Sequence, residues 1–201
     1  MNKNNIHPIN DRLISKTEKE KLLGHRGAVF WLYGLSGSGK STLVVDMEKR
    51  LSKQNTHSVV LDGDNIRTGL NSDLGFSDAD RKENIRRVSE VARLFALNGV
   101  IVLVSLITPF RELRSLAKSI IGENSFHEIF IKASFATCKS RDVKGLYAKA
   151  TSGKVDQFTG QESKFEEPSN DCFVIDSEKE TLQESGDKLF QYILQSISLT
   201  K

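Results

Sequence analysis

One segment of the sequence has the residue types and spacing of a phosphate-binding loop. Residues 34–41 read Gly-Leu-Ser-Gly-Ser-Gly-Lys-Ser and fit the pattern G-x-x-x-x-G-K-[ST] at every position. In such a loop the glycines let backbone N–H groups close around phosphate oxygens, the lysine reaches the β and γ phosphates, and the serine hydroxyl can bind Mg²⁺. The pattern predicts a site for ATP or GTP, with a chance glycine-rich turn as the alternative. The predicted nucleotide-binding residues are Gly34, Leu35, Ser36, Gly37, Ser38, Gly39, Lys40 and Ser41.

Two carboxylates and a guanidinium follow a second apolar segment. Asp62, Asp64 and Arg67 lie in Leu-Asp-Gly-Asp-Asn-Ile-Arg, residues 61–67. An aspartate here can help to hold Mg²⁺ or accept the proton of an attacking hydroxyl, and the arginine can bind an anionic group. An ordinary Asp-Gly turn is the alternative reading. Because the sequence contains no N-K-x-D tetrapeptide to read guanine, the donor is expected to be ATP and the protein a small-molecule kinase.

Short apolar segments alternate with helical patterns along the chain, which is typical of a parallel sheet covered by helices on both faces. The sequence therefore predicts an open, three-layer α/β fold with a mostly parallel five-stranded sheet. In such folds, ligands bind beyond the carboxyl ends of the strands, where both candidate sites lie. The predicted strands are residues 29–33, 58–61, 100–104, 128–132 and 173–175.

The best-defined helix is predicted from Ser77, a capping residue, to about Asn98. Arg81 and Asn84 are three residues apart, so they share a face near the helix start, where the helix dipole favours anions. A solvated polar face is the alternative. Further along, residues 145–168 lose strand periodicity, and this irregular segment is predicted to be a lid over the reactants.

Composition limits the other classes of function. The length of 201 residues suits one catalytic domain, predicted at residues 25–201, and the polar residues 1–24 are predicted to form an N-terminal arm. The formal charge of +3 gives no reason to expect a nucleic-acid partner. No apolar run approaches the roughly 20 residues of a membrane span, and the polar start lacks a secretory signal, so a cytoplasmic protein is expected. The two cysteines and four histidines have no metal-ligand spacing.

Several further motifs make the chain resemble the adenylylsulfate kinases, a family with the P-loop nucleotide-kinase fold. The resemblance rests on these segments together and covers nearly the whole chain. They are residues 34–42, Leu61–Arg67, Gly69–Asn71, Asp73–Ser77, Asp80-Arg81, Glu83–Arg87, Lys144–Tyr147 and Phe158–Gly160.

The resemblance implies transfer of the γ-phosphoryl group of MgATP to the 3′-hydroxyl of adenosine 5′-phosphosulfate (adenylylsulfate), a step of sulfate assimilation. It implies Lys40, Asp62 and Asp64 as catalytic residues, with Asp64 orienting or deprotonating the hydroxyl, and Ser41 and Asp62 beside Mg²⁺. Thr42 and Arg141 would join the ATP site. The implied adenylylsulfate-binding residues are Asp64, Arg67, Phe76, Arg81, Asn84, Lys144, Gly145, Leu146 and Phe158, with Phe76 and Phe158 sandwiching the adenine. A homodimer and a functional link to sulfate adenylyltransferase are the partners that the resemblance suggests.

Three positions depart from the family pattern. Thr108 stands where a serine is common, which makes it a candidate phosphoacceptor whose β-branched side chain argues against copying that role. Val143 replaces a usual proline and Lys164-Phe165 a usual Pro-Tyr, both near the lid. Two alternatives to the family assignment stay open: another small-molecule kinase, of the gluconate or shikimate type, and a non-catalytic nucleotide-binding module.

Overall fold

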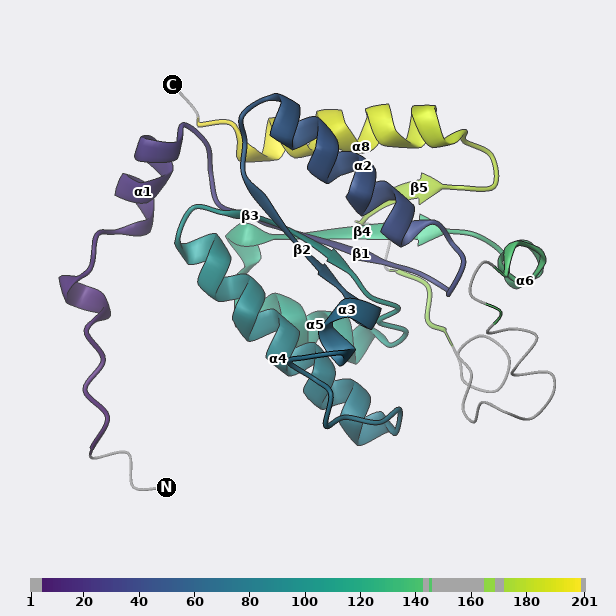
Figure 1. Ribbon diagram of the computed structural model, residues 1–201, viewed down its shortest axis with the longest axis horizontal. Coiled ribbons are helices and arrows are strands. Elements are labelled where there is room, and N and C mark those ends of the chain that lie inside the picture. Colours follow the sequence, from purple (N-terminus) through teal and green to yellow (C-terminus); the bar gives the residue numbers. More distant parts are fainter. Residues whose placement is uncertain (1–4, 143–144, 146–164, 169–171, 200–201) are drawn as a thin grey trace.

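A five-stranded parallel sheet forms the centre of the protein. The computed structural model describes residues 5–142, 145, 165–168 and 172–199. The strand order is β2-β3-β1-β4-β5, and every neighbouring pair is parallel (Figure 1). The predicted three-layer α/β fold is confirmed, although β4 begins at Phe126 rather than at Glu128. The strands are β1 (Val29–Tyr33), β2 (Ser58–Asp62), β3 (Ile101–Ser105), β4 (Phe126–Lys132) and β5 (Phe173–Asp176).

Helices cover both faces of the sheet. Figure 1 shows α2 and α8 on one face and α4 and α5 on the other. The helices are α1 (Lys16–Leu23), α2 (Lys40–Lys53), α3 (Gly63–Arg67), α4 (Asp78–Leu97), α5 (Arg111–Ile121), α6 (Phe135–Arg141) and α8 (Leu182–Ile197), with 3₁₀ turns η2 (Asn10–Arg12) and η3 (Glu123–Ser125). None of the described helices combines the length and apolar character that crossing a membrane requires.

The central strand β1 contributes to two apolar cores. Its side chains alternate, so that Phe30 and Leu32 pack under α2 and α8 whereas Val29, Trp31 and Tyr33 pack under α4 and α5. All five residues have no exposed surface. This double burial explains why β1 reads as a continuous apolar run rather than as an alternating one.

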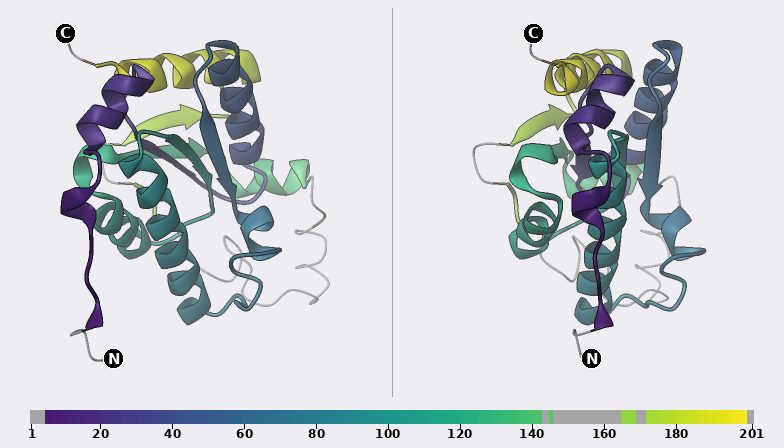
Figure 2. Two further views of the ribbon diagram at one scale, coloured as in Figure 1. Left: turned by 60° about the vertical axis from the view of Figure 1, so that its left-hand side comes forward. Right: turned by 90° about the vertical axis from the view of Figure 1, so that its left-hand side faces the viewer.

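The segment before β1 lies outside the three layers (Figure 2). Its helix α1 starts at a capping box formed by Ser15 and Glu18. Polar contacts tie it to the body of the protein, because Lys16 Nζ donates to Ser125 Oγ at 2.7 Å and Lys19 Nζ donates to Asn98 Oδ1 at 2.8 Å.

A core substitution in α2 should lower stability far more than a surface one on the same helix. Met47 has no exposed surface, whereas Val45 is 44% exposed. We expect Met47→Ala to reduce the free energy of unfolding by about 2–5 kcal/mol, because it removes buried atoms and leaves a cavity. Val45→Ala should change it by less than about 0.5 kcal/mol. Urea denaturation followed by circular dichroism measures both, and equal losses would contradict the assignment of α2 to the core.

His127 gives the fold a predictable pH dependence. Its ring stacks on Phe30 at 4.8 Å, and burial lowers its pKa from the ordinary value of 6.5. The unfolded chain therefore binds a proton more readily, so this contribution to stability is complete above about pH 6.5 and is lost as the pH falls below it. His127→Phe keeps a ring at the stack but cannot titrate. Between pH 7.5 and 5, the wild type should lose stability relative to this variant in denaturant titrations, and parallel curves would refute the prediction.

Candidate active site

The phosphate loop connects β1 to α2 at the carboxyl edge of the sheet. Gly34, Gly37 and Gly39 have φ angles of 152°, 78° and 102°, which side-chain-bearing residues rarely adopt. At Gly34 a Cβ atom would also lie 2.4 Å from the carbonyl oxygen of Ile131 on β4. The glycines therefore allow the loop to turn sharply against the sheet and to begin α2 at Lys40.

The Lys40 side chain folds back over this loop. Its Nζ donates to the carbonyl oxygens of Gly34 at 2.9 Å and Leu35 at 2.7 Å, and the residue is only 8% exposed. An ammonium held at the mouth of a phosphate loop can exchange carbonyl oxygens for phosphate oxygens when a nucleotide binds. This position fits the role expected from the sequence.

Three oxygen-bearing side chains meet where α2, β2 and β3 adjoin. Ser41 Oγ donates to Asp62 Oδ2 at 2.8 Å and lies 3.3 Å from Ser105 Oγ. Asp62 and Ser105 are also register partners at the ends of β2 and β3. The structure thus brings together the two residues predicted to lie beside the metal, and it adds Ser105, which the sequence patterns did not single out.

This oxygen cluster fits Mg²⁺ better than a transition metal. Mg²⁺ prefers hard oxygen donors and is usually held by one or two protein ligands together with water and substrate phosphates. Within the described residues, no group of three or more His, Cys, Asp or Glu side chains could hold a metal ion. Ser41 and Asp62 would therefore supply the protein's share of a site completed by phosphate oxygens.

Asp62 and Asp64 have different surroundings, although the same motif contains both. Asp62 caps α3, because its Oδ1 accepts from the Asp64 backbone N–H at 3.1 Å while its Oδ2 accepts from Ser41. Asp64 lies in the first turn of α3 and its side chain is exposed. The cap binds Asp62 into the fold and leaves Asp64 at the surface of the candidate site.

The predicted anion-binding arginines converge on the segment between α3 and α4. Arg67 Nη1 donates to the carbonyl oxygens of Leu74 at 3.1 Å and Gly75 at 2.8 Å, and the guanidinium lies 4.4 Å from the ring centroid of Phe76. Arg81 Nε donates to the Phe76 carbonyl oxygen at 2.9 Å. Burial lowers the pKa of both arginines, although arginine remains charged at neutral pH. The two arginines therefore hold the backbone of this mostly exposed segment, with carboxylates such as Asp64 and Asp80 nearby.

Phe76, in this segment, and Asn84, on α4, lie in opposite surroundings. Phe76 is 62% exposed, which suits a ring that stacks on a ligand base. Asn84 is only 5% exposed and accepts from Asn71 Nδ2 at 2.9 Å. The alternative of a solvated polar face is wrong for Asn84, because the turn that contains Asn71 covers it.

Thr108 is a buried structural residue in this arrangement. It is 2% exposed, its φ angle is 42°, and its Oγ1 accepts from Trp31 Nε1 at 3.0 Å. A phosphoacceptor hydroxyl must reach the donor at the surface of the site. The placement therefore argues against the phosphoacceptor role considered for Thr108 from the sequence.

A buried arginine that the sequence patterns missed ties the loop after β3 to the end of the expected lid. Arg114 is 2% exposed, and its Nε forms an ion pair with Glu128 Oε1 at 3.2 Å. Its Nη1 donates to the Thr108 carbonyl oxygen at 3.0 Å, and its Nη2 donates to that of Glu166 at 2.9 Å. The only sequence signal was an arginine on the apolar face of α5.

Phe165 continues this connection to the phosphate loop. Its ring stacks at 6.3 Å on Tyr33 and at 5.8 Å on Phe130, and it packs with the cluster that contains Leu35. The described end of the expected lid is therefore anchored beside the nucleotide site.

Arg141 lies on the predicted ATP side. Its guanidinium donates to the carbonyl oxygens of Gly37 at 3.5 Å and Ser177 at 2.6 Å. Gly145 has a φ angle of 63° and donates to the Asp142 carbonyl oxygen at 2.9 Å. The remaining predicted positions lie outside the described residues; they are Val143, Lys144, Leu146 and Phe158.

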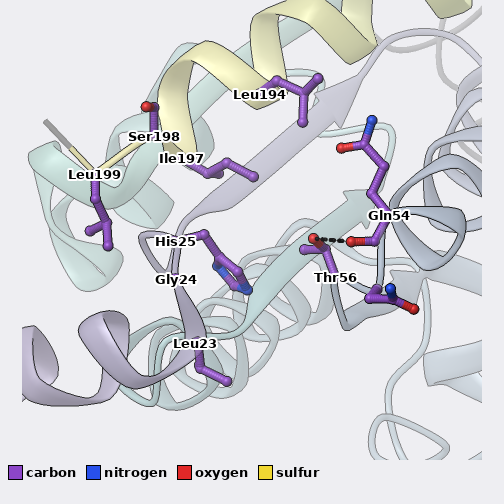
Figure 3. Close-up of a pocket in the computed structure, with 10 residues that line it drawn as sticks. Leu23, Gly24, His25, Gln54, Thr56, Leu194, Ile197, Ser198 and Leu199 are labelled. Atoms are coloured by element: carbon purple, nitrogen blue, oxygen red, sulfur yellow. Dashed lines mark hydrogen bonds between the residues drawn. The ribbon is translucent and has the colours of Figure 1, made fainter. Parts of the chain in front are cut away.

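A separate pocket lies between the end of α1 and the ends of α2 and α8 (Figure 3). Leu23, His25, Thr56 and Ile197 are among the residues that line it. Leu23, His25 and Thr56 precede β1 and β2, so the pocket is at the amino ends of the strands. The candidate active site lies at the opposite, carboxyl ends.

Comparisons with known proteins find relatives that cover most of this chain. The adenylyl-sulfate kinase of Bacteroides fragilis is 46% identical over 195 residues, which cover 97% of this chain and 96% of that protein. The solved structure of the Mycobacterium tuberculosis APS kinase in complex with AMPPNP and APS is 43% identical, with a TM-score of 0.76 over 85% of this chain and 97% of that one. A gluconokinase from Sinorhizobium meliloti, 16% identical with a TM-score of 0.58 over 84% of this chain, shares the fold alone.

The family model for adenylylsulphate kinase matches residues 26–176, a range that starts just before β1 and ends with β5. The match contains the phosphate loop, the Asp62 and Asp64 motif, and the segment between α3 and α4. The chain belongs to the adenylylsulphate kinase family.

Proposed function

We propose that the protein is an adenylyl-sulfate kinase that phosphorylates the 3′-hydroxyl of adenylylsulfate with ATP. The products are ADP and 3′-phosphoadenosine 5′-phosphosulfate. In the reaction, the acceptor oxygen forms a bond to the γ-phosphorus as the bond from that phosphorus to the β,γ-bridging oxygen breaks. The hydroxyl proton passes to a base, and the leaving electron pair stays on ADP.

One observation carries this proposal beyond family membership. The Ser41 to Asp62 hydrogen bond joins the phosphate loop directly to the residue that caps α3, at 2.8 Å. The donor site and the segment with Arg67 and Phe76 therefore share one edge of the sheet. Phosphoryl transfer depends mainly on positioning and charge neutralisation, and this adjacency supports the positioning of the two substrates.

On the donor side, the loop backbone and Lys40 would hold the β and γ phosphates of ATP, with Arg141 beside the loop. Ser41 and Asp62 would hold Mg²⁺, which when bound offsets the negative charge of the phosphate oxygens. Thr42 follows on the exposed side of α2 and is proposed as a further contact to the nucleotide.

Asp64 is the proposed base. Asp62 uses both carboxylate oxygens within the fold, whereas Asp64 is exposed at the start of α3. A carboxylate in that position can accept the proton of a hydroxyl that approaches the phosphate loop.

On the acceptor side, Arg67, Arg81 and Asn84 would bind the phosphosulfate and ribose, and Phe76 would stack on the adenine. The guanidinium groups of Arg67 and Arg81 at the segment between α3 and α4 would bind an anionic nucleotide more favourably than a neutral sugar. Lys144, Gly145, Leu146 and Phe158 are proposed to complete this site from the expected lid.

Loss of the phosphate-loop ammonium should abolish activity with little change in the fold. We expect Lys40→Ala to lower turnover by at least about a hundredfold, because the transferred phosphoryl group loses a positioned positive charge. Lys53→Ala, an exposed lysine at the other end of α2, is the matched control and should retain activity. Initial rates and thermal melts of both variants test this, and equal rates would contradict the role of Lys40.

The acceptor is identified by ADP release in a coupled assay with MgATP. Adenylylsulfate, gluconate, shikimate and no acceptor form the parallel arms. We expect adenylylsulfate alone to stimulate release. Stimulation by gluconate or shikimate would replace the proposed acceptor, and binding of adenylylsulfate without any turnover would favour a non-catalytic module.

A further inference from the structure

Asn71 is a fully buried amide in the turn that follows α3. It has no exposed surface, and its backbone is held by two turn hydrogen bonds, from its N–H to the Ile66 carbonyl oxygen at 3.0 Å and from the Leu74 N–H to its own carbonyl oxygen at 3.1 Å. Its side chain reaches α4, where Nδ2 donates to Asn84 Oδ1 at 2.9 Å.

Burial of the Asn71 amide lowers the stability of the fold. Burial of an amide costs free energy unless its polar atoms are hydrogen-bonded. Asn71 Oδ1 is buried and has no hydrogen-bond partner among the described residues. Of the two polar groups of the Asn71 side chain, the NH₂ group is therefore hydrogen-bonded, to Asn84, and the carbonyl oxygen is not.

Arg87 attaches the same turn to α4 at a second point. Arg87 forms hydrogen bonds to both carboxylate oxygens of Asp73, at 2.7 Å and 2.9 Å, and a longer one of 3.3 Å to the Leu70 carbonyl oxygen. These charged contacts hold the turn at the surface of α4. The buried amide pair is therefore one of two attachments of the turn to α4, and it is the one that involves a predicted acceptor-binding residue, Asn84.

The hydrogen bond defines the orientation of the Asn84 amide relative to Asn71. Because Asn84 Oδ1 accepts from Asn71, the Asn84 NH₂ group is the end left to turn toward a ligand. An NH₂ group attracts the oxygens of an anionic nucleotide, whereas the opposite orientation would present a carbonyl oxygen and repel them.

We propose that Asn71 is a positioning residue that orients the Asn84 amide as a hydrogen-bond donor to the anionic nucleotide acceptor. The inference rests on the proposed function, since it takes adenylylsulfate as that acceptor. It adds a residue that has no contact of its own with substrate.

Asn71→Asp provides the sharpest test, because it keeps the size and shape of the side chain. An ionised aspartate can only accept, so Asn84 must turn its NH₂ group inward and present oxygen to the acceptor. We expect the KM and the calorimetric Kd for adenylylsulfate to rise at least about tenfold, which corresponds to about 1.4 kcal/mol. The KM for ATP should stay within about twofold of the wild type. Asn71→Ala, which leaves the amide free to rotate, should give a smaller rise.

Two controls separate positioning from a general loss of structure. Ser89→Ala removes another buried polar group from α4, a hydroxyl that donates to the Ile85 carbonyl oxygen at 2.7 Å, and it should leave the KM for adenylylsulfate unchanged. In an Asn84→Ala background, Asn71→Asp should have no further effect on that KM, because the amide it misorients is gone.

The outcomes are distinct. If Asn71→Asp and Asn71→Ala leave adenylylsulfate binding unchanged, raise the KM of both substrates equally, or act undiminished in the Asn84→Ala background, the positioning role is overturned. If Asn71→Asp does not fold, the same comparisons are made with Asn71→Ala. A wild type that phosphorylates a different acceptor overturns the proposed function instead, and it does so before any variant is made.

Discussion

The parallel pairing of β1 with β3 and β4 is the constraint on which the site depends. Parallel strands bring all their carboxyl ends to one edge, so the segments that follow β1, β2 and β3 must meet there. Those segments carry the phosphate loop, the Asp62 cap and the loop with Thr108. Burial of β1 on both faces holds this strand in the interior of the sheet, because removal of either covering layer would expose apolar side chains.

Local patterns in the sequence predicted the elements and the donor site. The bounds of β1 were predicted correctly, and the helix expected from Ser77 begins with Ser77 as its cap. The roles of Arg114 and Asn71 could not be read in the same way. Each depends on a partner that tertiary packing brings close, such as Glu128 on β4 for Arg114. Residue spacing along the chain does not predict which partner that is.

The two substrate sides are stabilised by different physical means. The phosphate loop takes its sharp turns from glycine conformations, and side chains such as Lys40 and Arg141 bind its carbonyl oxygens. The segment from Arg67 to Asn84 relies on side chains that bind backbone carbonyls or one another.

The hydrogen bond between Trp31 and Thr108 has a spectroscopic consequence. Trp31 is the only tryptophan in the sequence, and its indole N–H is bonded to the loop that follows β3. Indole emission depends on the polarity and hydrogen bonding around the ring. The tryptophan fluorescence of the unlabelled protein therefore comes from one buried position beside the candidate active site, and a change in that loop on substrate binding would be visible without any attached dye.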